Sequence, residues 1–296
     1  MTEQAAVQRR CMFCDRAKGD LVDPNDPASQ AVIMTREHIF RSSWKDKIVV
    51  SPLPNNQPMG DREFTRYGRD FTPKSSRPEP LFEVVVKPVC DYCNNGWMND
   101  LDSAVEPWIL DPYNGECDPV DLRRWAIKVA VLRSRHEHPR VPQPEDFTSL
   151  YSGDDIADWH IFVGRTLYPS HSHTFAGVGP ITPAGGRGLG LTQVSWSLGH
   201  VAVVAIRLVG EETGKELFKA FKYHNRSEGI MVAEVSPTAK RIPNLAQLPE
   251  LTPIKWESIV WYYSTHPLSP IAAGLAEMDD GFRSVLEQHG APYNDL

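Results

Sequence analysis

The chain has 296 residues, and 41% of them are apolar, which is enough to build a sizeable core and excludes a wholly disordered chain. No stretch approaches the ~20 consecutive apolar residues of a membrane span, and the polar start MTEQAAVQRR does not resemble a signal peptide. We therefore expect a cytoplasmic protein without a membrane partner.

The net charge of −7 does not favour nucleic-acid binding by itself. The average conceals a basic segment, because residues 36–77 hold nine lysines and arginines but only five acidic residues. Attraction to phosphate depends on local charge, so this segment could hold a nucleic-acid backbone. An ordinary solvated loop is the alternative interpretation.

Paired cysteines mark the first third of the chain. Cys11 and Cys14 form one CxxC pair, Cys90 and Cys93 form a second, and Cys117 is left over. Thiols stay reduced in the cytoplasm, so two such pairs favour a metal over disulfides. Four thiolates suit tetrahedral Zn²⁺ and leave no open position, which predicts a structural role for the ion.

Two strands and a short helix are predicted around these cysteines. Residues 31–40 read as a strand that runs into a turn, and residues 81–90 read as a strand that leads into the second CxxC pair. A helix from about Asn94 to Val105 follows. Loops rich in proline and asparagine fill an insertion at about 41–80.

The clearest helix in the sequence is predicted over residues 118–135, where Asp118 can cap and Pro119 suits the first helical position. We expect this linking helix to pack between the front and back parts of the chain, through an apolar stripe formed by Leu122, Trp125, Ala126, Val129 and Leu132.

The back part alternates strands and helices. The predicted strands 191–199 and 201–209 are expected to form a tight hairpin at Gly199 and His200. The pattern predicts an α+β fold with an antiparallel sheet. The predicted strands are 158–167, 173–181, 191–199, 201–209 and 254–265, and the predicted helices are 213–224 and 279–288.

One order of residues carries a resemblance to a known family. Glu37-His38 lies at the end of a predicted strand between the two cysteine pairs, and Asn94 directly follows Cys93. This order resembles that of the HNH (ββα-metal, His-Me finger) endonucleases with a four-cysteine structural zinc, in the arrangement typical of endonuclease VII. The phrases EHIF and CNNGWMNDLD are also similar to a group of uncharacterised bacterial and phage HNH-type proteins.

The resemblance covers roughly residues 11–105 and implies a zinc-stapled ββα-metal module over residues 1–105. Residues 106–296 then form an α+β domain of unknown role. In this interpretation His38 is the general base, and Glu37 and Asn94 hold a catalytic Mg²⁺ or Mn²⁺. Phosphate contacts are expected from the cations that flank the base: Arg36, Arg41 and Lys45.

The implied activity is metal-dependent hydrolysis of DNA phosphodiester bonds, with RNA as a substrate left open. The back domain would supply target choice or dimerisation. A catalytically inactive, zinc-stabilised module that binds nucleic acid is the main alternative, and an enzyme seated in the back domain is a weaker one.

Several features depart from the family pattern. Glu37 stands where the family usually has Asp, and 51 residues separate His38 from Cys90. The middle asparagine that orients the base is unassigned, with Asn55 and Asn56 as candidates. Asn95 could replace Asn94 as the ligand, although both asparagines also suit a helix start.

Overall fold

The computed structural model describes most of the first 260 residues, and its fold is α+β with antiparallel sheets, as predicted. Residues of five stretches are described by their backbone alone: 63–67, 73–78, 168–181, 189–191 and 208–209. The described residues are 9–48, 63–67, 73–78, 80–137, 142–154, 156, 158–181, 189–209, 219 and 221–260.

A two-stranded antiparallel sheet and a following helix form the N-terminal part of the described structure. The register pairs Met34 with Cys90 and His38 with Val85, and it shifts between Thr35 and Glu37. Both predicted strands are present over shorter ranges, since residues 81–83 form a helical turn, and the helix continues beyond its predicted end at Val105. The elements are β1 (Met34–His38), β4 (Val85–Cys90), α1 (Asp91–Cys93), the π-helical turn η3 (Asn94–Met98) and α2 (Asn99–Leu110).

The insertion between β1 and β4 contains structure of its own. Its two strands pair with each other in a separate antiparallel hairpin, with Glu63 opposite Pro78. A short helical turn stands on each side of this hairpin. The elements are η1 (Ser42–Trp44), β2 (Glu63–Tyr67), β3 (Pro73–Pro78) and η2 (Leu81–Glu83).

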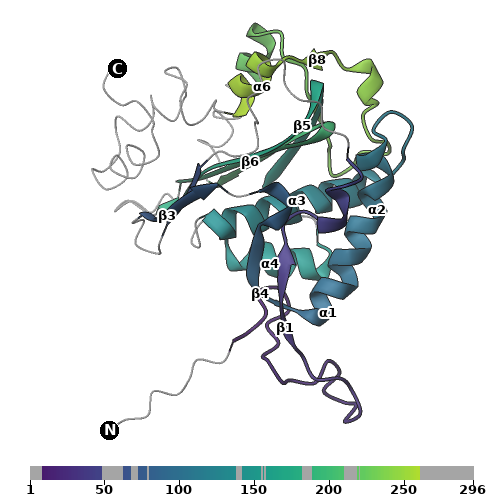
Figure 1. The fold of residues 1–296 in the computed structure, drawn as a ribbon, viewed down its shortest axis with the longest axis vertical. Helices are drawn as coiled ribbons and strands as arrows, with labels where there is room; N and C mark the ends of the chain where they lie inside the picture. The colour runs from purple at the N-terminus through teal and green to yellow at the C-terminus, as the bar shows by residue number, and fades with distance from the viewer. Residues whose placement is uncertain are drawn as a thin grey trace.

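Helix α3 (Pro119–Glu137) lies at the centre of the molecule and contacts α2, α4 (Pro144–Ser152) and the sheet behind it (Figure 1). The Asp118 carboxylate accepts a hydrogen bond from the Val120 backbone N–H at 2.7 Å, so the predicted cap is present. Every residue of the predicted apolar stripe is buried. Trp125 of α3 contacts Trp44 of η1 and Trp196 of the sheet, at centroid distances of 6.0 and 5.8 Å.

The back sheet is built on one long hairpin that crosses the molecule beside α3 (Figure 1). It consists of β5 (Trp159–Ile181) and β6 (Leu189–Val209), with β7 (Ala233–Glu234) antiparallel and β8 (Glu250–Leu251) parallel to β5. The predicted hairpin at Gly199 and His200 is wrong, because β6 runs through both residues. Gly199 has a φ of +59° and lies where the register shifts between Arg165 and Ser170. Its positive φ therefore accommodates an irregularity within β6 and does not form a hairpin turn.

The prediction of a strand over 254–265 is wrong for its first part, because Pro253–Val260 form helix α6, which follows the short turn η4 (Leu245–Gln247). Thr252 starts the helix: its hydroxyl accepts from the Lys255 N–H at 3.4 Å, and Pro253 occupies the first turn. Residues 261–265, the predicted helix at 279–288 and most of the one at 213–224 lie outside the described residues, although 221–227 are helical.

The buried core runs without a break from the cysteine region to the back sheet, and it includes Cys11, Trp125 and Leu245. Helix α2 passes through residue 105, where the division into two domains is predicted, and that division stays a prediction. Within the described ranges no helix is both long and apolar enough to cross a membrane.

Candidate metal centre

Four sulfur atoms from two distant parts of the chain converge at one point. The Sγ atoms of Cys11, Cys14, Cys90 and Cys93 all lie within 4.8 Å of one another. The distance is 3.8 Å between Cys11 and Cys93 and 3.6 Å between Cys14 and Cys90. A tetrahedral ion with Zn–S bonds of about 2.3 Å requires sulfurs roughly 3.8 Å apart. The predicted four-cysteine group is confirmed as a site that could hold a metal ion, and its geometry fits zinc.

Backbone geometry presents each pair of sulfurs. The chain turns after Cys11, where the Asp15 N–H donates to the Cys11 carbonyl at 3.0 Å and Asp15 takes a left-handed φ of +57°. The second pair stands where β4 meets α1, and the Cys93 N–H donates to the Cys90 sulfur at 3.4 Å. The Cys90 N–H donates to the Cys11 sulfur at 3.4 Å, so backbone donors already face the sulfurs. Such donors stabilise thiolates.

Mutual hydrogen bonding makes the four thiols ionise unequally. The hydrogen bond with Cys11 lowers the pKa of Cys14, whereas the hydrogen bond with Cys11 raises the pKa of Cys93. Four thiolates in so small a space repel one another, and a bound dication removes that repulsion. The donor set therefore suits a thiophilic dication that binds with release of protons.

The helix start after the second cysteine pair lies directly on β1. The Asn94 side-chain Nδ2 donates to the Thr35 hydroxyl at 3.2 Å and to the Arg36 carbonyl at 3.3 Å. Among the described residues its amide oxygen accepts no hydrogen bond. Asn95, the alternative ligand, is exposed and lines a surface pocket with Tyr92. Asn94, and not Asn95, therefore faces the strand that carries Glu37 and His38.

Glu37 is a buried carboxylate, only 5% exposed. No donor in the described part of the chain gives it a hydrogen bond, and its ion pair with the Lys128 ammonium is long, at 3.9 Å. Burial raises the pKa of Glu37 to about 7; Lys128 opposes this rise and Asp102 adds to it. The negative charge of a buried Glu37 carboxylate is only partly balanced by one long ion pair. The surroundings of this carboxylate therefore fit a divalent cation as a further partner.

His38 ends β1 and is half-buried. Within the described residues its imidazole makes no hydrogen bond or ion pair. Arg36 lies at the irregularity in the β1 register between Thr35 and Glu37, and its side chain is exposed. Lys87 of β4 is also exposed on this hairpin.

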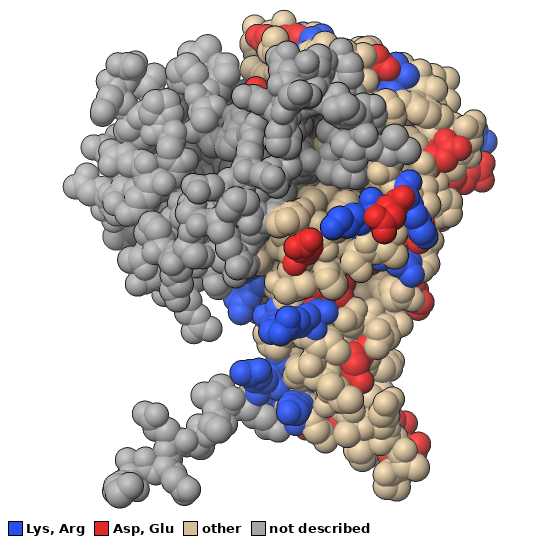
Figure 2. Space-filling model, in the orientation of Figure 1, with Lys and Arg blue, Asp and Glu red and all other residues tan. Residues whose placement is uncertain are grey.

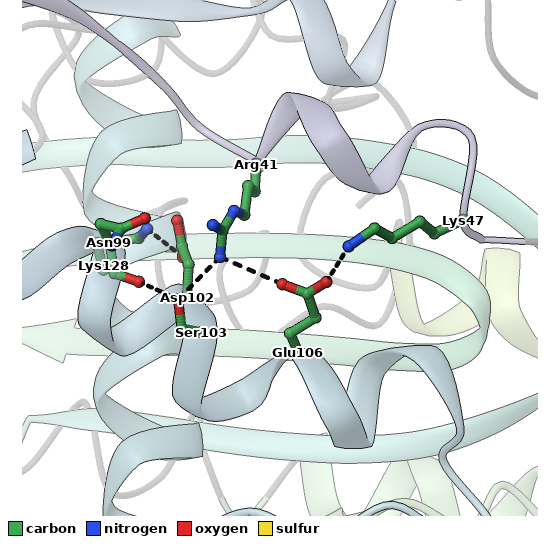
Figure 3. Close-up of polar contacts among 7 residues, drawn as sticks. All are labelled: Arg41, Lys47, Asn99, Asp102, Ser103, Glu106 and Lys128. Carbon is green, nitrogen blue, oxygen red and sulfur yellow. Dashed lines mark hydrogen bonds and ion pairs between the residues drawn. The ribbon is translucent and has the colours of Figure 1, made fainter. Parts of the chain in front are cut away.

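The predicted phosphate contacts differ in their surroundings. Arg36 is exposed, whereas Arg41 is tied to α2 through Ser103 at 2.9 Å and Glu106 at 3.2 Å (Figure 3). Lys45 forms an exposed ion pair with Glu83 at 3.5 Å. On the face drawn in Figure 2, lysine and arginine side chains form a broken band that rises from the N-terminal segment past the region of β1 and β4. Asn55 and Asn56, the candidates for the middle asparagine, lie outside the described residues.

Sequence reasoning missed two buried charges beside Glu37. The Lys128 ammonium is 2.5 Å from an Asp102 carboxylate oxygen, and Lys128 is fully buried (Figure 3). Asp102 is only 6% exposed. Lys128 lies outside the apolar stripe of the predicted helix 118–135, and no local sequence pattern indicates that it is buried. Its burial depends on how α2 and β1 pack against α3.

Comparison with known proteins gives no match: no family model, no curated protein and no solved structure is similar to this chain. The cysteine cluster stands on its own geometry. The resemblance to HNH endonucleases, the catalytic Mg²⁺ or Mn²⁺ and the DNA partner stay predictions.

Proposed function

We propose that the protein is an HNH-type endonuclease that hydrolyses DNA phosphodiester bonds and uses a structural zinc to build its site. The contact of the Asn94 amide with the Arg36 carbonyl, at 3.3 Å, carries this proposal. It fixes the first residue after the fourth cysteine against the strand that ends in His38. In the proposed site the His38 imidazole and the oxygen donors of Glu37 and Asn94 act together at this end of the hairpin.

Each residue has a defined task in the proposed reaction. His38 accepts a proton from the attacking water, because an imidazole near neutral pH is a suitable base. The carboxylate of Glu37 and the amide oxygen of Asn94 are the ligands for a divalent cation, whose other positions water can fill. Such an ion, when bound, would neutralise the phosphate and stabilise the leaving oxygen.

The exposed face of the hairpin supports a nucleic-acid partner. Arg36 precedes His38 by two residues on β1, Lys87 stands on the neighbouring strand, and both of these cations are exposed. In this proposal both cations attract a phosphate backbone toward the base, and such contacts weaken as salt concentration rises. Arg41 is occupied with α2 and contributes to folding in this proposal.

The proposal is tested with His38→Ala and with His160→Ala as a matched control. His160 is a partly exposed histidine on β5 that pairs with Glu234. We expect plasmid cleavage with Mn²⁺ to fall about a hundredfold or more in His38→Ala, because a general base contributes that much. His160→Ala should cleave like the parent, and both variants should retain zinc and their melting temperature. Cleavage by His38→Ala at the parental rate would overturn the proposed base.

The second candidate function is a zinc-stabilised module that binds nucleic acid without cutting it. The burial of Glu37 against Lys128 favours this candidate, because an ammonium already provides part of the positive charge that a metal would bring. Retarded migration of a DNA fragment, with no cleavage in Mg²⁺, Mn²⁺ or Ni²⁺, would decide for the binding module.

A further inference from the structure

Three charged groups from three different elements meet below the end of β1. Glu37 belongs to β1, Asp102 to α2 and Lys128 to α3. The Lys128 ammonium lies 2.5 Å from Asp102 Oδ1 and 3.9 Å from Glu37 Oε1. All three side chains are nearly or fully inaccessible to solvent. The Lys128 ammonium therefore forms ion pairs with two carboxylates, a close one with Asp102 and a long one with Glu37.

Stability alone is a poor explanation for this cluster. Burial of an ammonium costs several kcal/mol, and a well-packed apolar side chain in its place is often neutral or stabilising. The neighbouring positions of α3 are filled by apolar residues such as Ala126 and Val129, so this environment accepts them. The close contact with Asp102 fixes the ammonium, and the fixed ammonium then faces Glu37.

We propose that Lys128, held by Asp102, is a positioning residue that sets the place of the Glu37 carboxylate in the nucleolytic site. This inference rests on the proposed function and extends it. The site is then not confined to the zinc-held hairpin and helix, because α3 supplies one of its parts. The 3.9 Å contact restrains the Glu37 carboxylate without a hydrogen bond from Lys128.

The decisive variants are Lys128→Met, Lys128→Arg and the control Arg133→Met. Arg133 is a fully buried cation on the same helix, and its ion pair is with Glu137, four residues along α3. The control removes a buried charge from α3 without touching the cluster at Glu37. Zinc content and melting temperature are measured for every variant.

Lys128→Met should lower the cleavage rate at saturating Mn²⁺ by about a hundredfold, the effect of a misplaced catalytic group. Lys128→Arg should recover much of the rate, and Arg133→Met should retain it. Parental cleavage by Lys128→Met, or an equal loss in Arg133→Met, would overturn the inference.

A second readout does not depend on cleavage. Lys128→Met leaves two buried carboxylates without their shared cation, so its melting temperature should fall. Adding Glu37→Gln removes one of these charges, and the double variant should melt at a higher temperature than Lys128→Met alone. Additive effects of the two substitutions would contradict the coupling.

The two proposals fail in different ways. Absence of cleavage by the parent chain would overturn the proposed function and this inference with it. Cleavage by the parent and by Lys128→Met alike would overturn this inference alone.

Discussion

Five cysteines divide into four that meet and one that lies apart. Cys117 lines a different pocket, beside Tyr113 and Pro119, and burial raises the pKa of its thiol to about 12. A thiol with so high a pKa stays protonated near neutral pH, and the thiolate is the form that binds metals. The cluster and the remaining cysteine therefore have different chemistry.

Cys14→Ala should lose zinc, whereas Cys117→Ala should keep one zinc per chain. Removal of one sulfur opens the tetrahedron, because a structural site uses all four ligands. The measurement is metal content by mass spectrometry after exhaustive dialysis, together with a count of reactive thiols. Equal zinc content in the two variants would show that the four sulfurs do not share an ion.

Single functional residues could be predicted where a short sequence motif contains them. The cysteine pairs are recognisable because the two residues of each pair are neighbours in sequence. Lys128 and Asp102 could not be found this way, because their contact joins two helices and their burial depends on packing. A helical pattern identifies an apolar stripe but gives no reason for a charge to be buried beside it.

Helix α2 is fastened to the turn around η1 by one carboxylate with two cations. Glu106 is hydrogen-bonded to Lys47 and lies 3.2 Å from Arg41 (Figure 3). Burial opposes ionisation of Glu106, but the hydrogen bond from Lys47 and the charges of Lys47 and Arg41 outweigh it. Its pKa is therefore held below the ordinary value of 4.5.

Glu106→Gln should lower the free energy of unfolding at pH 7 by about 1 kcal/mol, since these groups are partly exposed. A carboxyl with a lowered pKa stabilises the folded chain above its unfolded pKa and loses that contribution as pH falls. The difference between parent and variant should therefore shrink below pH 4.5 toward the lower folded pKa. Urea unfolding from pH 3 to pH 7 measures it.

Glu83→Gln is the matched control for this test, because Glu83 forms a more exposed ion pair with Lys45 at 3.5 Å. It should change stability by a few tenths of a kcal/mol or less. A deficit of Glu106→Gln that is constant across the pH range would contradict an electrostatic origin.

Whole elements were predictable where local capping and periodicity agree. Asp118, Pro119 and the apolar stripe defined α3 almost to its ends. Pairing partners were less accessible: β6 continues through Gly199 because β5 is long enough to pair with both of its halves. In α6 the buried residues Trp256, Ile259 and Val260 have helical spacing, but the aromatic and β-branched content favoured a strand.

At the scale of the whole molecule, the cysteine cluster is part of the core. Cys11, Cys90 and Cys93 belong to the same buried cluster as Trp125 and Trp196. Trp44, Trp125 and Trp196 connect the insertion, α3 and the back sheet. The α+β class followed from the pattern of elements, but this continuity could not be predicted, because it depends on contacts between distant segments.

Removal of zinc should therefore destabilise the described structure as a unit. Loss of about 5 kcal/mol would lower the melting temperature by roughly 10 °C in a chain of this size. Far-UV circular dichroism reports the helices and strands, and near-UV signals report the buried tryptophans. Both should shift together after treatment with a chelator and recover together when zinc is restored. Two separate transitions, of which only one responds to the chelator, would show that the cysteine cluster and the back sheet fold independently.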